Sequence, residues 1–215
     1  MRGIDLIAGF ELEINKLDNS LNKPVTDDSI YWLNQAVMKF MKDRFNGNAP
    51  KRTSYEQNEK RTRDLINLLR EVEYMSPERY DSNHASYDSY EYIYPTDMMY
   101  ALNEDVIISD NAGNHQMDVS VFECTADSFM YRIMNGLTDF HYKYHRARPL
   151  RIRTIVQKDG ELHSGFRLLT DKNYKIQSYT LGYLAVPTEI TNENPSRKYE
   201  DFEDYTWQEI IKIAA

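Results

Sequence analysis

Apolar residues recur every three or four positions near the start of the chain, and this spacing predicts two helices with one apolar face each. The first covers residues 4–17, with its apolar face formed by Ile4, Ile7, Phe10, Ile14 and Leu17. The second begins at Thr26, a favourable N-cap residue. Its apolar face consists of Ile30, Leu33, Val37, Phe40, Met41 and Phe45.

Two further helices are predicted, one before the middle of the chain and one at its C-terminal end. The third runs from Ser54 to Val72, with a charged first half and an apolar second half. Near the end, Thr206 and Glu209 form the T-x-x-E pattern of a capping box before an apolar run, which predicts a helix that begins at Thr206. Because so short a helix is marginal in water, we expect it to pack on the N-terminal helices or on a neighbouring subunit.

Residues 76–94 have no helical period and are rich in Ser, Asp and Tyr. We expect a long loop or an arm here, because long stretches without regular structure are usually functional or disordered. Tyrosine is enriched at protein interfaces, which favours an arm that orders against a neighbour. The alternative is that these residues fill half-buried strand positions. The candidate interface residues of this segment are Tyr80, Tyr87, Tyr90 and Tyr92.

From residue 95 to residue 190 the pattern changes to β-branched and alternating residues, which predicts strands. The runs DVIISD and MDVSVFEC flank a turn and predict one hairpin. LRIRTIV and ELHSGFRLL predict a second hairpin, because Asp159-Gly160 lies between them. Residues 174–187 predict a strand pair or one bent strand, and SFMYRIMNGL fits a short helix or a strand.

The order of these elements predicts an α+β fold in which a helical bundle of three N-terminal helices and one C-terminal helix carries a β-rich insertion of hairpins. The predicted divisions are the N-terminal bundle part (1–75), a Tyr-rich arm or loop (76–94), the β-rich insertion (95–190), and a linker with the C-terminal helix that returns to the bundle (191–215).

Composition narrows the function classes. The net charge of -8 argues against a general nucleic-acid binder, which is usually basic. Cys124 is the single cysteine, so an intrachain disulfide is excluded, and we expect it to be a buried strand residue. No apolar run approaches the roughly 18 residues of a membrane span, and the first residues do not form a signal peptide. We therefore expect no membrane association.

Catalytic and cofactor motifs are not found in the sequence. It has no G-x-G-x-x-G, no P-loop, no H-E-x-x-H and no G-x-S-x-G pattern. His141 and His145 have the i, i+4 spacing that could place two metal ligands on one helix face. Lys143 and Arg146 beside them would repel a cation, so we predict no metal site, no cofactor and no catalytic residue.

The stretch HYKYHRARPLRIR, residues 141–153, is basic in an otherwise acidic chain. Arginine is the preferred interface cation, so these arginines are candidate contacts to a neighbouring subunit. A ladder of ion pairs within one sheet ranks second, and a nucleic-acid contact ranks third. The candidate residues are Arg146, Arg148, Arg151 and Arg153.

Three segments resemble the head-to-tail connector proteins of tailed bacteriophages, also termed adaptor or ring proteins, in particular those of crAss-like phages. The first is DDSIYWLNQAVMKF in the second predicted helix. The second is EKRTRDLINLL, followed later by YPTDMMY, and the third is the closing TWQEIIKIA. Trp207 stands where such sequences often have His, and Thr206 still provides the predicted cap.

The resemblance implies a non-enzymatic structural protein of the virion, without a cofactor, that forms a homo-oligomeric ring, usually a dodecamer, at the portal–tail junction. It is made in the host cytoplasm. The implied partners are the portal protein and neighbouring tail or ring proteins, while genomic DNA passes through the channel without specific binding. The alternatives are another tail or tail-tube structural protein, or a nucleic-acid-binding protein that uses the Arg-rich strand 143–153.

Overall fold

The computed structural model describes the chain apart from residues 18–24, 47–61, 126, 144–145 and 195, and its fold is α+β. Two compact units are present. Unit 1 comprises Met1–Leu69 and Ala185–Ala215, and unit 2 comprises Arg70–Leu184. The structure divides after residues 69 and 184, whereas the sequence predicts boundaries after residues 75, 94 and 190.

Among the described residues, no helix combines the length and apolar character needed to cross a membrane.

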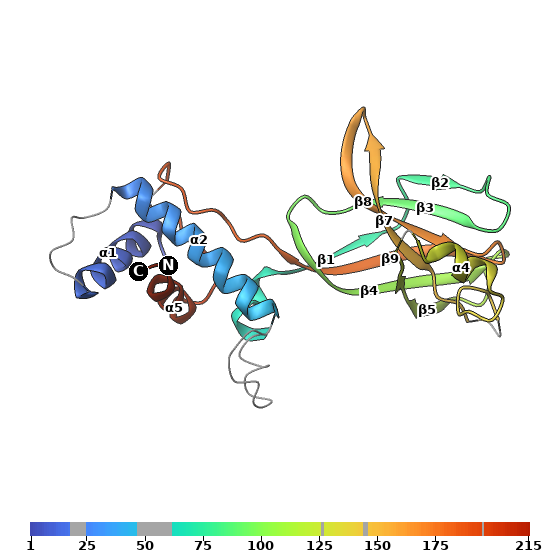
Figure 1. The fold of residues 1–215 in the computed structure, drawn as a ribbon, viewed down its shortest axis with the longest axis horizontal. Coiled ribbons are helices and arrows are strands. Elements are labelled where there is room, and N and C mark those ends of the chain that lie inside the picture. Colours follow the sequence, from blue (N-terminus) through green and yellow to red (C-terminus); the bar gives the residue numbers. More distant parts are fainter. Residues whose placement is uncertain (18–24, 47–61, 126, 144–145, 195) are drawn as a thin grey trace. The chain divides into compact units, whose positions relative to one another are not determined.

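Three helices pack against one another in unit 1 (Figure 1), namely α1 (Gly3–Leu17), α2 (Thr26–Asn46) and α5 (Asp204–Ala214). The first two predicted helices are therefore confirmed. On α2, Leu33, Val37, Phe40 and Met41 of the predicted face are buried, whereas on α1 Leu6 and Phe10 are buried and Ile4 of the predicted face is 54% exposed. Trp207 meets Phe202 edge to face, with 5.1 Å between the ring centroids. The buried side chains of this core include Leu6, Phe10, Leu33, Phe40 and Trp207.

The start of α5 differs from the prediction. The helix begins at Asp204, and the side chain of its N-cap residue, Glu203, makes no cap hydrogen bond. Thr206 lies buried in the first turn, where its hydroxyl donates to Asp64 Oδ1 at 3.5 Å. The predicted capping box is wrong because this hydroxyl serves a tertiary contact.

The third predicted helix is wrong in its apolar second half. Residues 62–64 are helical, but a 3₁₀ turn, η1 (Ile66–Leu68), and a strand, β1 (Leu69–Tyr74), follow. Strand β1 is hydrogen-bonded to β9 (Tyr174–Ala185), so pairing within a sheet overrides the helical spacing of its apolar residues. The charged first half of the prediction falls mainly on residues 47–61, outside the described part of the chain.

Two sheets make up unit 2 (Figure 1). One has the order β1, β9, β4 (Met98–Asp110) and β5 (Met117–Ser120). The other has the order β2 (Arg79–Asp81), β3 (Asp88–Ile93), β8 (Glu161–Thr170), β7 (Leu150–Lys158) and β6 (Phe122–Glu123). The sheets face each other across aromatic side chains: the Tyr179 ring of β9 lies 4.9 Å from Phe166 of β8 and 5.5 Å from Tyr92 of β3, centroid to centroid.

Both predicted hairpins are present. Strand β4 pairs with β5, and β7 pairs with β8 in an antiparallel register that ends with Lys158 opposite Glu161. The two turn residues between them, Asp159 and Gly160, have φ values of 52° and 87°, as the tight hairpin turns with two left-handed residues require. Residues 174–185 form the single strand β9. The run MDVSVFEC is split between β5 and β6, which belong to different sheets.

The expectation of a loop or arm at residues 76–94 is wrong for much of that segment. It contains β2 and β3, and β3 lies inside the five-stranded sheet between β2 and β8. Tyr90 and Tyr92 alternate along β3 with Glu91, and all three are buried. The burial of tyrosine on a strand, the alternative raised above, applies to these residues.

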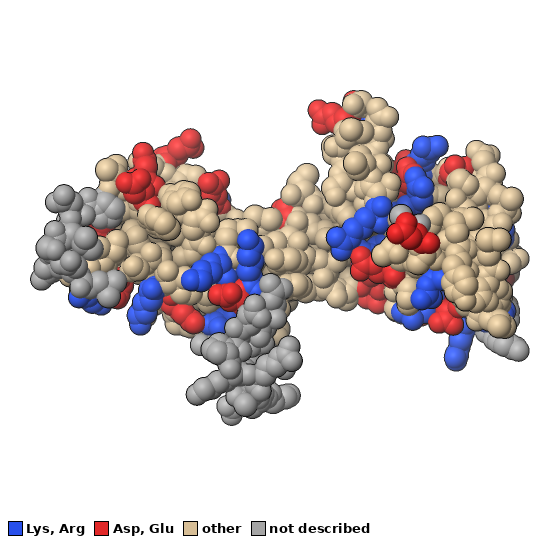
Figure 2. Space-filling view, viewed as in Figure 1, with Lys and Arg blue, Asp and Glu red and all other residues tan. Residues whose placement is uncertain are grey.

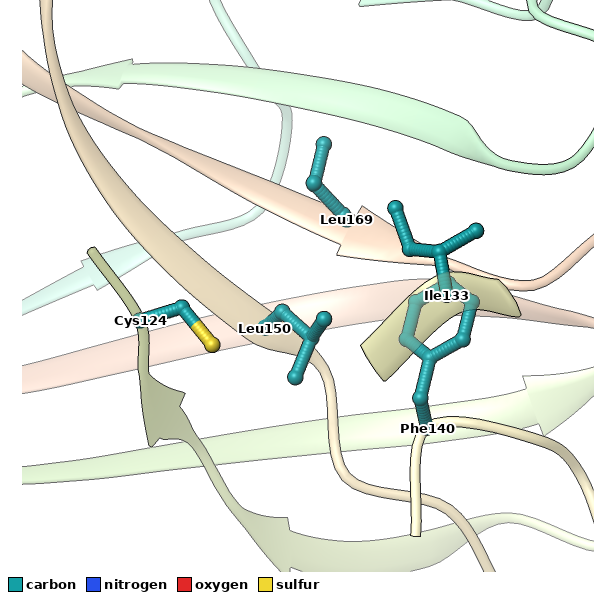
Figure 3. Close-up of a cluster of buried hydrophobic side chains, with 5 residues drawn as sticks. All are labelled: Cys124, Ile133, Phe140, Leu150 and Leu169. Carbon is teal, nitrogen blue, oxygen red and sulfur yellow. The ribbon is translucent and has the colours of Figure 1, made fainter. Parts of the chain in front are cut away.

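The stretch SFMYRIMNGL contains a short helix, α4 (Phe129–Met134). Its Ile133 is buried in a cluster with Phe140 and with side chains of β7 and β8 (Figure 3). Cys124 belongs to the same cluster and is buried, as predicted. This cluster fixes α4 on the five-stranded sheet, and its buried members are Cys124, Ile133, Phe140, Leu150 and Leu169.

Candidate subunit interface

Two of the predicted interface arginines form ion pairs within unit 2. Arg151 is buried, and its Nη1 lies 2.9 Å from Glu104 Oε1 of β4, while its Nη2 lies 3.0 Å from Glu123 Oε2 of β6. Arg153 is exposed, and its Nη2 lies 3.2 Å from Glu123 Oε1. The pairs of Arg151 and Arg153 with Glu123 lie within one sheet, as the second-ranked alternative expects, whereas the pair of Arg151 with Glu104 reaches the other sheet.

Burial also governs the groups around Arg151. It raises the pKa of the Glu104 carboxyl, although the adjacent guanidinium acts to lower that pKa. Arg151 Nη1 donates a hydrogen bond to the Tyr94 hydroxyl at 2.9 Å, and burial raises the pKa of that phenol too. Because β7 carries Arg151 and β4 carries Glu104, this charge network fastens one sheet to the other.

The other two predicted arginines lie nearer the surface. Arg146 is exposed, and its backbone forms an isolated bridge with Lys143. Arg148 is half-buried, and its guanidinium donates to the carbonyl oxygens of Ser120 and Val121 at 3.4 Å. These two side chains are therefore partly accessible to a partner, unlike Arg151.

The four predicted interface tyrosines fall into two pairs. Tyr90 and Tyr92 are buried, so neither presents its ring at the surface of the chain. Tyr80 is 48% exposed, and its hydroxyl donates to Asp88 Oδ2 at 3.1 Å. Tyr87 is half-buried and stacks on His84 with 4.2 Å between the ring centroids. Only Tyr80 offers a large accessible ring.

No group of three or more His, Cys, Asp or Glu side chains within the described ranges could hold a metal ion. Of the two histidines considered as ligands, His145 lies outside those ranges. His141 Nδ1 lies 3.7 Å from Asp171 Oδ2, a single carboxylate contact.

Sequence reasoning missed two exposed apolar surfaces of unit 2. One lies on α4 and the residues after it, where Met130, Tyr131, Met134 and Leu137 are exposed. The other lies on the β7–β8 hairpin, where Ile155 and Leu162 are exposed. A signal was present in SFMYRIMNGL, because apolar residues on successive positions cannot all face inward from one short helix.

Comparison with known proteins assigns the chain to a family. The sequence model of the family described as phage tail ring protein 3/4 matches residues 10–197. No curated protein matches the chain. The matched region contains all of unit 2 and most of unit 1. The chain therefore belongs to the phage tail ring protein 3/4 family of crAss-like phages, and it is a structural ring subunit of the virion.

Proposed function

We propose that the ring formed by this protein is part of the portal–tail connector, or neck, which joins the capsid to the tail. The family match over residues 10–197 is the observation that carries the proposal, because it assigns the chain to ring proteins of the tail. In this proposal the ring is a dodecamer that contacts the portal protein on one side and tail or ring proteins on the other.

The charge of the chain supports a channel through which DNA passes without specific binding. The net charge is -8, so a ring of many copies repels a polyanion on average. Arg151 is buried and paired with two glutamates, so it cannot reach a phosphate, and the exposed Arg153 lies beside Glu123. We infer that DNA slides past this ring and that no base or phosphate is held in place.

The exposed predicted residues have a role in the same proposal. Tyr80, Arg146 and Arg148 are accessible in whole or in part, so they can contact neighbouring subunits or virion proteins. The buried predicted residues make no direct contact with a partner in this proposal. They stabilise the two sheets that carry the exposed residues, and they are Tyr90, Tyr92 and Arg151. The four-helix bundle predicted for residues 1–75 and 191–215 is contradicted over the second half of its third helix, where η1 and β1 are found, and only the part on residues 54–61 stays a prediction.

The leading alternative is a nucleic-acid-binding protein that uses the Arg-rich segment 143–153. The observation in its favour is that Lys143 and Arg146 are exposed. Binding through phosphate contacts would weaken steeply as salt is raised, because counterions are released. A ring at another level of the tail or tail tube is the second alternative.

The experiment that tests the proposal is light scattering of the full chain, alone and mixed with the portal protein of the same phage. We expect a defined assembly of roughly twelve copies, each of 25.4 kDa, that binds the portal ring. Electron microscopy of intact particles would then find it between portal and tail.

A stable monomer that ignores the portal protein and binds DNA in a salt-sensitive way would contradict the proposal. Arg146→Glu would test that outcome, because it reverses an exposed charge that forms no side-chain ion pair among the described residues. Arg153→Glu is the matched control, since that guanidinium is already paired.

A further inference from the structure

The end of the β7–β8 hairpin stands beyond the sheet that carries it (Figure 1). Strand β3 accompanies β8 only as far as Gly165, opposite Ile93, whereas the pairing of β7 with β8 continues to Lys158 and Glu161. Two-stranded ribbons are marginal in water by themselves. We call residues 155–164 the hairpin tip.

One face of the hairpin tip is apolar and exposed. Ile155 lies opposite Ser164 and Leu162 lies opposite Gln157, so the two apolar residues are diagonal neighbours on the same face. Ile155 is 67% exposed and Leu162 is 73% exposed. Figure 2 shows uncharged residues along the projecting hairpin and acidic side chains at its end.

The hairpin tip is nevertheless held in one conformation. Lys158 Nζ lies 2.9 Å from Glu78 Oε1, and the Tyr94 amide donates to the Ser164 carbonyl oxygen at 3.1 Å. At the base, a Cβ on Gly165 would lie 2.7 Å from Val156 Cγ2, so only glycine allows this close packing. A fixed ribbon with an exposed apolar face suits a contact made without prior ordering.

The second exposed apolar surface lies on α4, which we call the α4 surface. Ile133 belongs to the cluster of Figure 3 and Phe129 packs against that cluster, whereas Met130 and Tyr131 between them are exposed. Met134 is 79% exposed and Leu137 is 87% exposed. Methionine and tyrosine are enriched at protein interfaces. The α4 surface consists of Met130, Tyr131, Met134 and Leu137.

Two arginines border the α4 surface, and both lie over one aromatic ring. The guanidinium carbon of Arg132 is 3.7 Å from the centroid of the Phe122 ring, and that of Arg148 is 5.7 Å from it. Within the described ranges no carboxylate forms an ion pair with either arginine. The turn at the end of the hairpin tip carries the exposed Asp159, whose negative charge is complementary to this border.

We propose that the hairpin tip of one copy packs its Ile155–Leu162 face on the α4 surface of the next copy in the ring. Asp159, in the turn of the tip, then lies against Arg132 and Arg148, while Glu161 is on the other face of the ribbon with Lys158. A closed ring built by rotation needs a heterologous contact, in which two different surfaces of the chain meet. The tip and the α4 surface are two such surfaces on one unit. The inference rests on the ring assembly in the proposed function and not on the place of the ring in the virion.

A cysteine pair tests the contact directly. The full chain would carry Leu162→Cys on the tip and Met134→Cys on the α4 surface, with the buried Cys124 left in place. The ring is assembled under conditions in which the unchanged chain forms it, oxidised gently, and run on a non-reducing gel. A head-to-tail contact joins each copy to two others, so we expect a ladder of covalent multimers up to the size of the ring.

Matched controls distinguish a disulfide formed at this contact from one formed by random encounters between copies. Chains with only one of the two new cysteines give nothing larger than a dimer, and the chain with neither gives the background. A chain with Leu162→Cys and Leu102→Cys, whose second site is exposed on β4, gives no ladder. An intact ring without a ladder, or a cross-link within one chain, overturns the inference and leaves the proposed ring standing. Failure of the unchanged chain to form any ring, even with the portal protein, defeats both.

A second variant measures the apolar part of the contact. Ile155→Ser with Leu162→Ser should raise the concentration at which half of the chain is assembled by about tenfold or more, because both side chains lose their burial. Leu102→Ser should leave it unchanged. If the double variant assembles normally but no longer binds another virion protein, the occupant of the tip is that protein, and the second-copy assignment is wrong.

Discussion

Among the described residues, each unit contains a buried ionic network that can be compared: one in unit 1 is centred on a carboxylate, and one in unit 2 is centred on an arginine. In unit 1, the side chain of Asp64 is 0% exposed and its Oδ2 lies 3.0 Å from Arg44 Nε. In unit 2, the central group is Arg151, held by two glutamates. The central carboxylate thus depends on one cation, whereas the central cation has two anions to pair with.

The two networks also join different parts of the chain. In unit 1, Arg44 lies on α2 and Asp64 lies later in the same N-terminal segment. Helix α5 supplies two more members of the network. The Tyr205 hydroxyl donates to Asp64 Oδ1 at 3.0 Å, and Glu209 Oε1 lies 2.6 Å from Arg44 Nη2. The network in unit 1 therefore fastens the C-terminal helix to the N-terminal segment, while that in unit 2 joins two sheets. Buried ion pairs therefore serve both kinds of unit: in unit 1 they join two separate segments of the chain, and in unit 2 they join two sheets of one continuous segment.

The largest test of this comparison is Arg44→Met. It leaves Asp64 enclosed without a cation, and we expect unit 1 to lose about 3–5 kcal/mol of unfolding free energy. Both tryptophans of the chain, Trp32 and Trp207, belong to unit 1, so tryptophan fluorescence during urea unfolding follows that unit alone. Arg63→Met, an exposed neighbour of Asp64, is the control and should change little. A loss below about 1 kcal/mol would show that the pair is not central to the unit.

The second test is Glu104→Gln, which leaves Arg151 with Glu123 as its remaining carboxylate. We expect a loss of no more than about 1.5 kcal/mol in unit 2 near pH 7, less than in the first test, because Glu123 stays beside Arg151 and the neutral amide resembles the protonated carboxyl that burial favours at this site. Circular dichroism of the strands during urea unfolding follows unit 2, which contains both sheets.

The same variant has a distinct pH signature. Burial raises the pKa of Glu104 above its ordinary 4.5 in the folded protein, so the folded state binds this proton more tightly than the unfolded chain does. The group therefore favours folding at low pH, and this contribution is lost as pH rises from 4.5 through the raised pKa. Glu104→Gln should remove this fall in stability. An unchanged slope across that window would mean that another group titrates there.

The smallest test compares two tyrosine hydroxyls. Tyr205→Phe removes a donor from the enclosed Asp64, and we expect a loss of about 1 kcal/mol in unit 1. Tyr94→Phe removes an acceptor from Arg151, which keeps both glutamates, so the loss in unit 2 should be smaller. Equal losses in separate urea titrations would contradict the idea that the number of partners decides the outcome.

Much of the fold follows from local pattern. The helices α1 and α2 and the Asp159-Gly160 turn depend on neighbouring residues, and the sequence predicts them correctly, although the face of α1 that is buried contains Leu6 and not Ile4. The strand β1 was missed because its apolar residues also fit a helix, and only its pairing with β9 decides the outcome. The alternation of Tyr90 and Tyr92 is typical of a strand. The sequence did not predict a buried strand here because Asp88, Ser89 and Glu91 around them are polar residues, which are usually exposed.

The candidate interface was less predictable, for a physical reason. A basic run in sequence does not reveal which charges are already neutralised, and Arg151 is neutralised by glutamates from β4 and β6. The exposed face of α4 depends on which of its residues the cluster around Ile133 buries. Which charged and apolar side chains stay exposed is decided by the packing of the strands and α4, and local sequence does not show it.

The discontinuity of unit 1 also sets an order of events during synthesis on the ribosome. Unit 2 has all its strands once Leu184 has emerged, so it can begin to fold while α5 is still being made. The apolar residues of α1 and α2 have no such opportunity, because Trp207, Ile210 and Ile211, which cover them, are translated after unit 2. The helices α1 and α2 are therefore made before unit 2 but packed after it, and nascent-chain chaperones would need to shield them in the interval.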